Sequence, residues 1–149
     1  MPLSIEIRPL AAGDFAHWEP LWQGYLAFYK ASVPDNTTRL SFSRLTGGVE
    51  PMGGFLAWSG ERAVGMVNWI MHRSTWTPGD YCYLQDLFAA PEARGQGVGR
   101  KLIEAVYAEA AARGCSRVHW LTQEGNAEAR LLYDRIAERS GFIQYRKLL

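Results

Sequence analysis

Cysteine is scarce in this chain of 149 residues, and long apolar runs are missing from it. The two cysteines, Cys82 and Cys115, lie far apart and form no CxxC pair, so we expect neither a disulfide framework nor a metal site. No window of about 18 uncharged apolar residues occurs, and we therefore expect no membrane-spanning helix and no membrane partner. The N-terminus has no secretory signal pattern, which favours a cytoplasmic location.

A surplus of charge of one sign is also lacking, since 16 Lys and Arg stand against 15 Asp and Glu. Proteins that bind nucleic acids carry a clustered basic face, so we predict no nucleic-acid partner. The C-terminal half is slightly more basic than the N-terminal half, which allows a local anion site there. Hydrophobic residues make up 48% of the chain, and its length fits a single domain over residues 1–149.

Hydrophobic periodicity predicts strands and helices that alternate in the second half of the chain. Helices are predicted over 14–32, 37–45, 97–113 and 126–138, and strands over 3–10, 54–58, 63–71, 81–89, 117–122 and 142–145. This order predicts an α/β fold with a mixed sheet, in which an antiparallel meander precedes a C-terminal parallel βαβ unit. On the first helix, aromatic residues recur at spacings of four, three and four and so share one face, either as core or as a pocket wall: Trp18, Trp22, Tyr25 and Tyr29.

Three alternate glycines, Gly95, Gly97 and Gly99, stand between the strand predicted at 81–89 and the helix that follows it. A helix N-terminus has unpaired amides and a partial positive charge, and glycines let those amides approach a phosphate. Arg94, Arg100 and Lys101 flank the glycines and add full charges. A tight turn without a ligand is the alternative. The dinucleotide fingerprint GxGxxG and the nucleotide loop GxxxxGK both fail to match.

The arrangement Arg94-x-x-Gly97-x-Gly99 resembles that of the GCN5-related N-acetyltransferase (GNAT) family, which uses it to bind the pyrophosphate of acetyl-CoA. The preceding LQDLFAAPEARGQGVGRKL is similar to that family's central strand and loop, and NAEARLLY at 126–133 is similar to its later helix. The chain looks most like the subgroup of fungal histone, polyamine and D-amino-acid acetyltransferases. The resemblance implies a GNAT acyl-CoA acyltransferase fold and acetyl-CoA as the cosubstrate.

The resemblance also implies roles for individual residues. The central strand would be splayed near 85–88, so that the backbone N–H of Leu87 faces the thioester carbonyl. The backbone from Leu87 to Ala89 would pair with the pantetheine arm, and Tyr133 would protonate the leaving thiolate. The residues expected to contact acetyl-CoA are Leu87, Phe88, Ala89, Arg94, Gly95, Gln96, Gly97, Val98, Gly99, Arg100 and Asn126. Asn126 is also a candidate cap for its helix.

Two features depart from the family pattern. Gln85 stands where polyamine-type relatives have a glutamate, and an amide cannot accept the amine proton. We expect Asp86 to point to the other face of the strand, which leaves water, Tyr83 or Glu19 as routes for that proton. Gly141-Phe142 follows Tyr133 by eight residues instead of about four, so that one final strand is expected instead of two. His119 is expected to be structural.

The expected activity is transfer of the acetyl group of acetyl-CoA to a primary amine of a small molecule, an amino acid or a polyamine-like compound, directly in a ternary complex. Gln85 and Tyr29 are the candidate substrate contacts, with Trp22, Tyr25 and Trp76 as further aromatic groups near the acceptor. Acetylation of lysines in histones or other proteins, and an acyl-CoA-binding module without catalysis, are the alternatives. A sheet with an open edge favours a homodimer.

Overall fold

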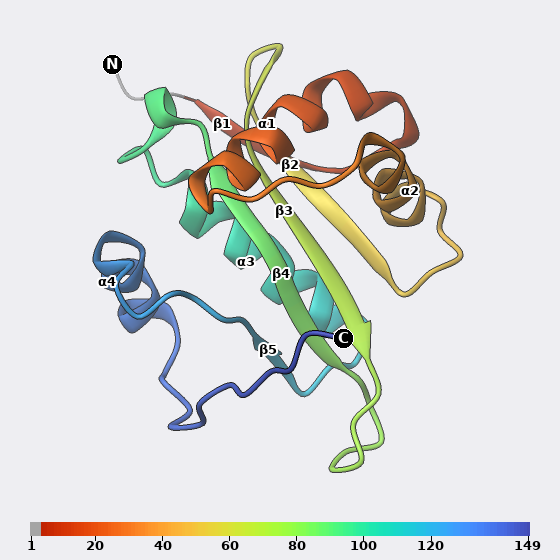
Figure 1. The fold of residues 1–149 in the computed structure, drawn as a ribbon, viewed down its shortest axis with the longest axis vertical. Coiled ribbons are helices and arrows are strands. Elements are labelled where there is room, and N and C mark those ends of the chain that lie inside the picture. The colour runs from red at the N-terminus through yellow and green to blue at the C-terminus, as the bar shows by residue number, and fades with distance from the viewer. Residues whose placement is uncertain (1–3) are drawn as a thin grey trace.

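The computed structural model describes residues 4–149 and contains a five-stranded sheet in the order β1-β2-β3-β4-β5 (Figure 1). Its strands are β1 (Ile5–Pro9), β2 (Met52–Ser59), β3 (Arg62–His72), β4 (Tyr81–Ala89) and β5 (Arg117–His119). Its helices are α1 (Phe15–Phe28), α2 (Asp35–Thr46), α3 (Val98–Ala112) and α4 (Ala127–Ile136), with short 3-10 turns η1 (Ala12–Asp14) and η2 (Pro91–Ala93). Strands β1 to β4 pair antiparallel and β4 pairs parallel with β5, which confirms the predicted meander and βαβ unit.

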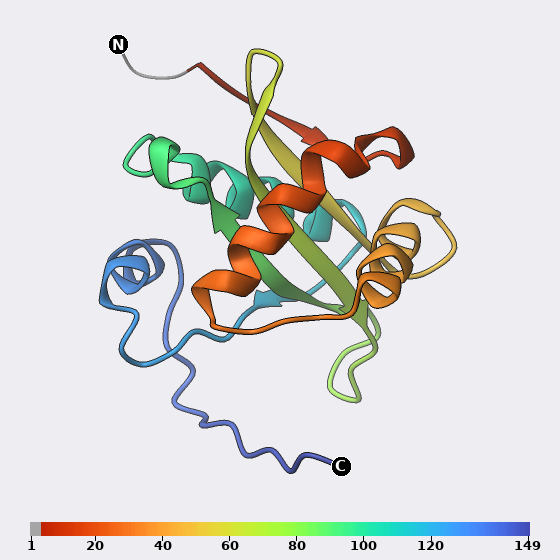
Figure 2. The ribbon, with the colours of Figure 1, turned by 45° about the horizontal axis from the view of Figure 1, so that its top comes forward.

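Helices cover both faces of the sheet, with α1 and α2 on one face and α3 on the other (Figures 1 and 2). Successive strand residues point to opposite faces, so neighbours such as Leu56 and Ala57 enter different cores. Trp18 of α1 is fully buried against Leu56 and its surroundings, while Leu102 of α3 is fully buried on the opposite side. Two apolar layers therefore hold the sheet between the helices.

Strand β5 is shorter than the sequence indicates, since it ends at His119 and not at residue 122. It pairs with β4 only at Tyr81, Cys82 and Tyr83, whereas β4 continues to Ala89 beside β3. The chain after His119 leaves the sheet and leads into α4. Among the described residues, 84–89 of β4 thus have strand partners on one edge only.

The strand predicted at 142–145 is wrong, because residues 137–149 form neither helix nor strand in the described chain. Figure 2 shows this segment running away from the sheet. The short β5 offers few backbone groups along its outer edge with which a further strand could pair. As a result the apolar side chains of Phe142, Ile143 and Tyr145 are 86%, 76% and 87% exposed.

Gly65 of β3 allows α3 to lie close to the sheet. A Cβ atom at this position would come within 2.6 Å of Val98 Cγ1 and 3.2 Å of the Phe88 carbonyl oxygen. We expect Gly65→Ala to lower the free energy of unfolding by about 1–2 kcal/mol in urea denaturation, because the inserted methyl group overpacks this contact. Gly13→Ala is the control, since a Cβ there meets nothing within 4 Å. Equal effects of the two substitutions would contradict the close approach at Gly65.

Candidate active site

The free edge of β4 presents extended backbone from residue 84 to Ala89. A strand edge of this kind can pair with an extended ligand through main-chain hydrogen bonds. Leu87 and Phe88 lie on this stretch, which α1 covers on one face. The Phe88 ring fits beneath α1 because Gly24 has no side chain, since a Cβ at Gly24 would lie 2.8 Å from that ring. The free edge is therefore bordered by packed and well-defined structure.

The glycine loop, residues 95–99, joins the end of β4 to α3. Gly95 and Gly97 have φ angles of +78° and +79°, and a Cβ at either would meet nothing within 4 Å, so the space above this backbone is open. The first hydrogen bond of α3 runs from the Lys101 amide to the Gly97 carbonyl at 3.0 Å, and no side chain of the described residues caps the helix. The amides of the first turn, with the positive end of the helix dipole, suit a phosphate group.

The three flanking cations are placed differently. Arg94 lies against the rings of Phe88 and Phe28, with Cζ at 5.6 and 6.0 Å from their centroids, and its Nε donates to the Ala89 carbonyl at 3.3 Å. Arg100 Nε donates to Glu104 at 2.8 Å. The amino group of Lys101 is directed to the Ile5 carbonyl of β1 at 3.5 Å. Arg94 is thus the cation held at the end of the free edge.

Tyr133 of α4 lies on the same side of the molecule as the glycine loop. The preceding residue, Leu132, would be 3.7 Å from a Cβ at Gly99, which shows that α4 packs beside the start of α3. The Tyr133 ring meets Trp120 edge-on at 5.4 Å. Burial, with a smaller contribution from Tyr29, raises the pKa of Tyr133 to about 12. Its phenol therefore carries its proton throughout the physiological pH range.

Asn126 occupies the position before α4, as the sequence indicates, but its side chain does not cap the helix. Its Nδ2 donates instead to Thr122 Oγ1 at 3.3 Å. The Asn126 carbonyl accepts the amide of Arg130 at 3.1 Å and so begins the helix through its backbone. This places Asn126 at the junction between the segment that follows β5 and α4.

A β-bulge interrupts β4 at Gln85. Trp69 of β3 pairs with Leu84 and its neighbour Asn68 pairs with Asp86, so that Gln85 is an extra residue without a partner in the register. The bulge breaks the alternation of side chains along the strand. The expectation that Asp86 points away from Gln85 is therefore wrong, because both residues line the same cavity.

This cavity has a volume of about 300 Å³ and lies between α1, α2 and the sheet. It is lined by Trp18, Trp22, Ser41, Arg44, Leu45, Met52, Asn68, Ile70, Gln85 and Asp86. Gln85 is exposed, whereas Asp86 is buried. The aromatic face predicted from helix spacing is present, since Trp18 stacks on Trp22 and Trp22 on Tyr25, and Trp18 and Trp22 form an aromatic wall of the cavity. Trp76 is 84% exposed and is not among the residues that line the cavity.

Tyr29 connects the two sides of the site. Its ring meets that of Tyr25 at 5.1 Å, and burial followed by the Asp86 carboxylate raises the pKa of Tyr29. Tyr29 in turn contributes to the raised pKa of Tyr133. Tyr29 of α1 is thus near enough to Asp86 of β4 and to Tyr133 of α4 for charge on one to affect the pKa of the other, although the three are far apart in the sequence.

The other candidate proton acceptors are less well placed. Glu19 accepts a hydrogen bond from Gln23 on its own helix and is not among the residues that line the cavity. Tyr83 lies near Asp86, and burial followed by that carboxylate raises the pKa of Tyr83. His119 is half-buried, stacks on Tyr83 and lies 2.9 Å from His72 between their Nε2 atoms. Burial and nearby Arg117 lower the pKa of His119.

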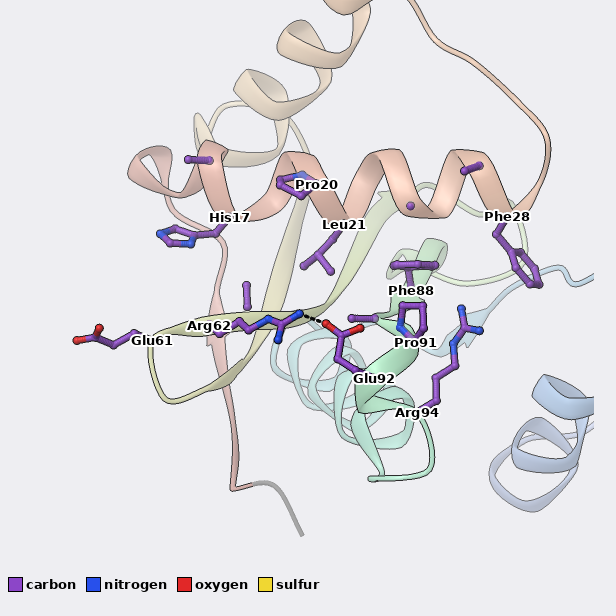
Figure 3. Close-up of a pocket in the computed structure, with 15 residues that line it drawn as sticks. His17, Pro20, Leu21, Phe28, Glu61, Arg62, Phe88, Pro91, Glu92 and Arg94 are labelled. Atoms are coloured by element: carbon purple, nitrogen blue, oxygen red, sulfur yellow. Dashed lines mark hydrogen bonds and ion pairs between the residues drawn. The ribbon is translucent and has the colours of Figure 1, made fainter. Parts of the chain in front are cut away.

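A second hollow, of about 770 Å³, runs beneath α1 (Figure 3). It is an open groove between α1, the β2–β3 turn and η2, and its floor includes the ion pair of Arg62 with Glu92. Phe28, Phe88 and Arg94 stand together at one end of it, whereas His17 and Glu61 lie at the other (Figure 3). The groove therefore reaches the end of the free edge of β4 through Arg94.

Sequence reasoning missed the polar group at the bulge. Trp18 Nε1 donates to Asn68 Oδ1 at 3.2 Å, and Asn68 Nδ2 donates to Asp86 Oδ2 at 3.0 Å. The signal in the sequence is Asn68 itself, a lone polar residue within the apolar run AVGMVNWIM. A buried amide in such a run requires partners.

Two further features bear on the class of protein. Residues 4–149 contain no group of three or more His, Cys, Asp or Glu side chains that could hold a metal ion. Among the helices of the described chain, none has both the length and the apolar character needed to cross a membrane.

Comparisons with known proteins agree with this geometry. The yeast Saccharomyces cerevisiae has a D-amino-acid N-acetyltransferase, HPA3, that is 32% identical over 145 residues, which are 96% of this chain and 90% of that protein. A thialysine N-epsilon-acetyltransferase of Sus scrofa is 41% identical over 66 residues, 44% of this chain and 38% of that protein. The structure of the aminoglycoside N-acetyltransferase AAC(6')-Iy with a bisubstrate analogue of CoA superposes with a TM-score of 0.83 at 20% identity, covering 98% of this chain and 99% of that one.

The family model described as Acetyltransferase (GNAT) family matches residues 18–137, a range that runs from α1 to the end of α4. Enzymes of this family use acetyl-CoA, and the same aminoglycoside acetyltransferase has also been solved with CoA. The family model and the yeast relative both match most of the chain, and the bulged central strand and the glycine loop before α3 agree with them. The chain therefore belongs to the GNAT family of N-acetyltransferases.

Proposed function

We propose that this enzyme transfers the acetyl group of acetyl-CoA to a primary amine of a small molecule, an amino acid or a polyamine-like compound. Transfer is direct, within a ternary complex. The observation that carries the proposal is the free edge of β4, which leads from the glycine loop to the bulge at Gln85 and Asp86. An acyl-CoA arm can lie along this edge while the amine approaches from the 300 Å³ cavity between α1, α2 and the sheet.

The residues of the glycine loop and of β4 fit acetyl-CoA, which supplies a thioester. The pyrophosphate lies at the positive end of α3, where it accepts hydrogen bonds from backbone amides of Gly95, Gln96, Gly97, Val98, Gly99 and Arg100. Arg94 adds a full positive charge. The backbone of Leu87, Phe88 and Ala89 pairs with the pantetheine arm. Asn126 contacts the cofactor from the start of α4.

Two groups serve the chemistry in this proposal. The amide N–H of Leu87 faces the thioester carbonyl oxygen and stabilises the negative charge that develops there. Tyr133 protonates the sulfur that leaves. A phenol with a pKa of about 12 holds its proton until the thiolate, whose conjugate thiol has a pKa near 8.5, has formed.

The acceptor enters the 300 Å³ cavity that Gln85 lines. Tyr29, which packs on Tyr25 and is not among the lining residues, would contact the acceptor from outside this cavity. The cavity has room for a small molecule, and Arg44 on its rim can pair with a carboxylate. An amino acid therefore fits better than an extended polycation. Support comes from the names of the relatives, which act on D-amino acids and on thialysine. Acetylation of protein lysines and acyl-CoA binding without turnover are the alternatives, and the assays below separate them.

We further propose a homodimer in the cytoplasm, where acetyl-CoA is available. The apolar side chains of the C-terminal segment would be covered by a second copy, since they are too exposed to contribute to the core of their own chain. They are Phe142, Ile143, Tyr145, Leu148 and Leu149, all at least 76% exposed. The outer edge of β5 is available for pairing in the described chain.

The glycine loop gives a test of cofactor binding. Gly97→Ala places a Cβ at a φ of +79°, which costs about 1 kcal/mol of stability and shifts the loop amides. We expect affinity for acetyl-CoA, measured by calorimetry, to fall about tenfold. Gly60→Ala is the matched control, because Gly60 also has a positive φ, +61°, but lies in the β2–β3 turn. Equal affinities of the two variants, or tighter binding of ATP or NAD than of acetyl-CoA by the wild type, would exclude the assignment of the loop.

Tyr133→Phe tests the catalytic proposal. Thiol release from acetyl-CoA is measured with D-amino acids, thialysine and spermidine, and with a histone-tail peptide for the alternative acceptor. We expect kcat to fall about 100-fold while the Kd for acetyl-CoA is unchanged, because only the proton donor is removed. The control is Tyr81→Phe, at the start of β4 and far from the glycine loop. An unchanged kcat would remove Tyr133 as the acid, and no turnover by the wild type with any amine would favour the non-catalytic alternative.

The dimer is tested by light scattering after size exclusion at micromolar concentration. The wild type should have the mass of two chains. Replacing Phe142 and Ile143 together by serine should give a monomer without a change in far-UV circular dichroism, because both side chains lie outside the core. A monomeric wild type would contradict the proposal.

A further inference from the structure

Asp86 is a buried carboxyl group whose orientation is fixed by neighbours. Indole N–H is only a donor, so the amide atom of Asn68 that faces Trp18 Nε1 at 3.2 Å is its oxygen. The Asn68 NH₂ group must then face Asp86, and it donates to Oδ2 at 3.0 Å. The Tyr25 hydroxyl is near enough to this carboxylate to lower its pKa. The Asn68 amide of β3 thus holds Asp86 as a hydrogen-bond acceptor.

No cation balances this carboxylate among the described residues, since none of the ion pairs within 4–149 includes Asp86. Arg44 lines the same cavity but is exposed. A buried carboxylate without a counter-ion favours either protonation or the approach of a positive ligand. Burial accordingly raises the pKa of Asp86, and the hydrogen bond from Asn68 and the nearby Tyr25 hydroxyl partly oppose this rise. Asp86 is therefore a stronger base than an exposed aspartate.

The location of Asp86 matches the needs of the reaction. It lines the cavity proposed for the acceptor and precedes Leu87, whose amide is proposed to bind the thioester oxygen. Gln85 lines the cavity too, but its amide cannot accept a proton. A primary amine is almost wholly protonated at neutral pH and must lose a proton before it can react.

We propose that Asp86 is the general base that takes this proton, with Asn68 and Trp18 as positioning residues. The inference rests on the proposed acetyltransferase function. The ammonium proton passes to the Asp86 carboxylate, and the freed nitrogen lone pair forms the N–C bond as the C–S bond breaks. The nitrogen loses a second proton on becoming an amide, and this proton passes through water to Tyr133, which has given its own proton to the sulfur. Asp86 releases its proton to water, so that one proton leaves per turnover.

The decisive comparison is between a strongly basic and a weakly basic acceptor in the Asp86→Asn variant. With D-alanine we expect kcat/KM at pH 7 to fall at least about 100-fold. With aminooxyacetate, whose nitrogen is already neutral at this pH, the loss should be much smaller because no proton has to be removed beforehand. Asp35→Asn is the control, since it changes an exposed carboxylate paired with Arg39. Its rates should match those of the wild type.

The substitution should leave the fold intact. An asparagine can still accept from Asn68 through its oxygen, and a neutral side chain avoids the cost of ionising a buried group. Because the pKa of Asp86 is higher in the folded state than in the unfolded chain, the stability it contributes is present at low pH and falls as pH rises through that interval. The variant should thus be at least as stable as the wild type at pH 7, which thermal unfolding checks.

The Asn68→Ala variant tests whether Asn68 positions Asp86 for catalysis or only supports the fold. The other groups near Asp86 that titrate or carry charge remain in this variant, and they are Tyr25 and Tyr29 on α1, Tyr83 on β4 and Arg44 on α2. Loss of the Asn68 donor raises the pKa of the carboxyl, so the acid limb of the kcat/KM profile should move to higher pH. A purely structural role would lower the rate without moving this limb.

The outcomes distinguish the two proposals. If the wild type releases no thiol with any amine, the acetyltransferase proposal itself fails. If the wild type is active, Asp86 is not the base when Asp86→Asn lowers kcat/KM by the same factor with D-alanine and with aminooxyacetate. Asp86 is also not the base when the substitution leaves kcat/KM unchanged with both acceptors.

Discussion

The surplus residue in β4, Gln85, sets the arrangement of polar groups beneath α1. In a regular strand that counted Gln85 in the alternation, Asp86 would face α3, among apolar side chains that offer a carboxylate no donor. With the bulge, Asp86 stands opposite Asn68, and Asn68 reaches Trp18. The fully buried Trp18 anchors α1 in turn. The register shift at Gln85 therefore determines the contacts of Asp86 and Asn68, and through Trp18 it also affects the position of α1.

The same strand has a second constraint, the early end of β5. Because β5 has only three residues, it pairs with the first part of β4 only, and the second part of β4 has no strand on that edge. Unpaired backbone in a folded protein requires a partner, whether solvent or ligand. The proposed role of the free edge as a partner for acetyl-CoA follows from this requirement, and the glycine loop and α4 stand at its end. Binding and chemistry thus share one strand.

Much of the fold could be predicted from the sequence because its signals are local. Hydrophobic periodicity located α3 and the β2–β3 hairpin within a few residues, and Gly97 marks the start of a helix through its positive φ. The bulge could not be found in this way, since alternation along YCYLQDLFA is compatible with a regular strand. Asp86 pairs with Asn68 and Asn68 with Trp18, residues far apart in the sequence that only tertiary packing brings together. The expected strand at 142–145 fails for the complementary reason: its pattern is right, but no neighbour of sufficient length is there to pair with it.

The stack of Trp18 on Trp22 has an optical consequence. The two indole rings are 5.4 Å apart and tilted by only 10°, so their excited states couple. Such a pair gives a signal in near-ultraviolet circular dichroism that depends on the mutual orientation of the rings. Trp22 also donates to Thr38 of α2 at 3.1 Å, and both indoles line the cavity. The aromatic wall is therefore an intrinsic chromophore whose spectrum changes with the relative position of α1 and α2.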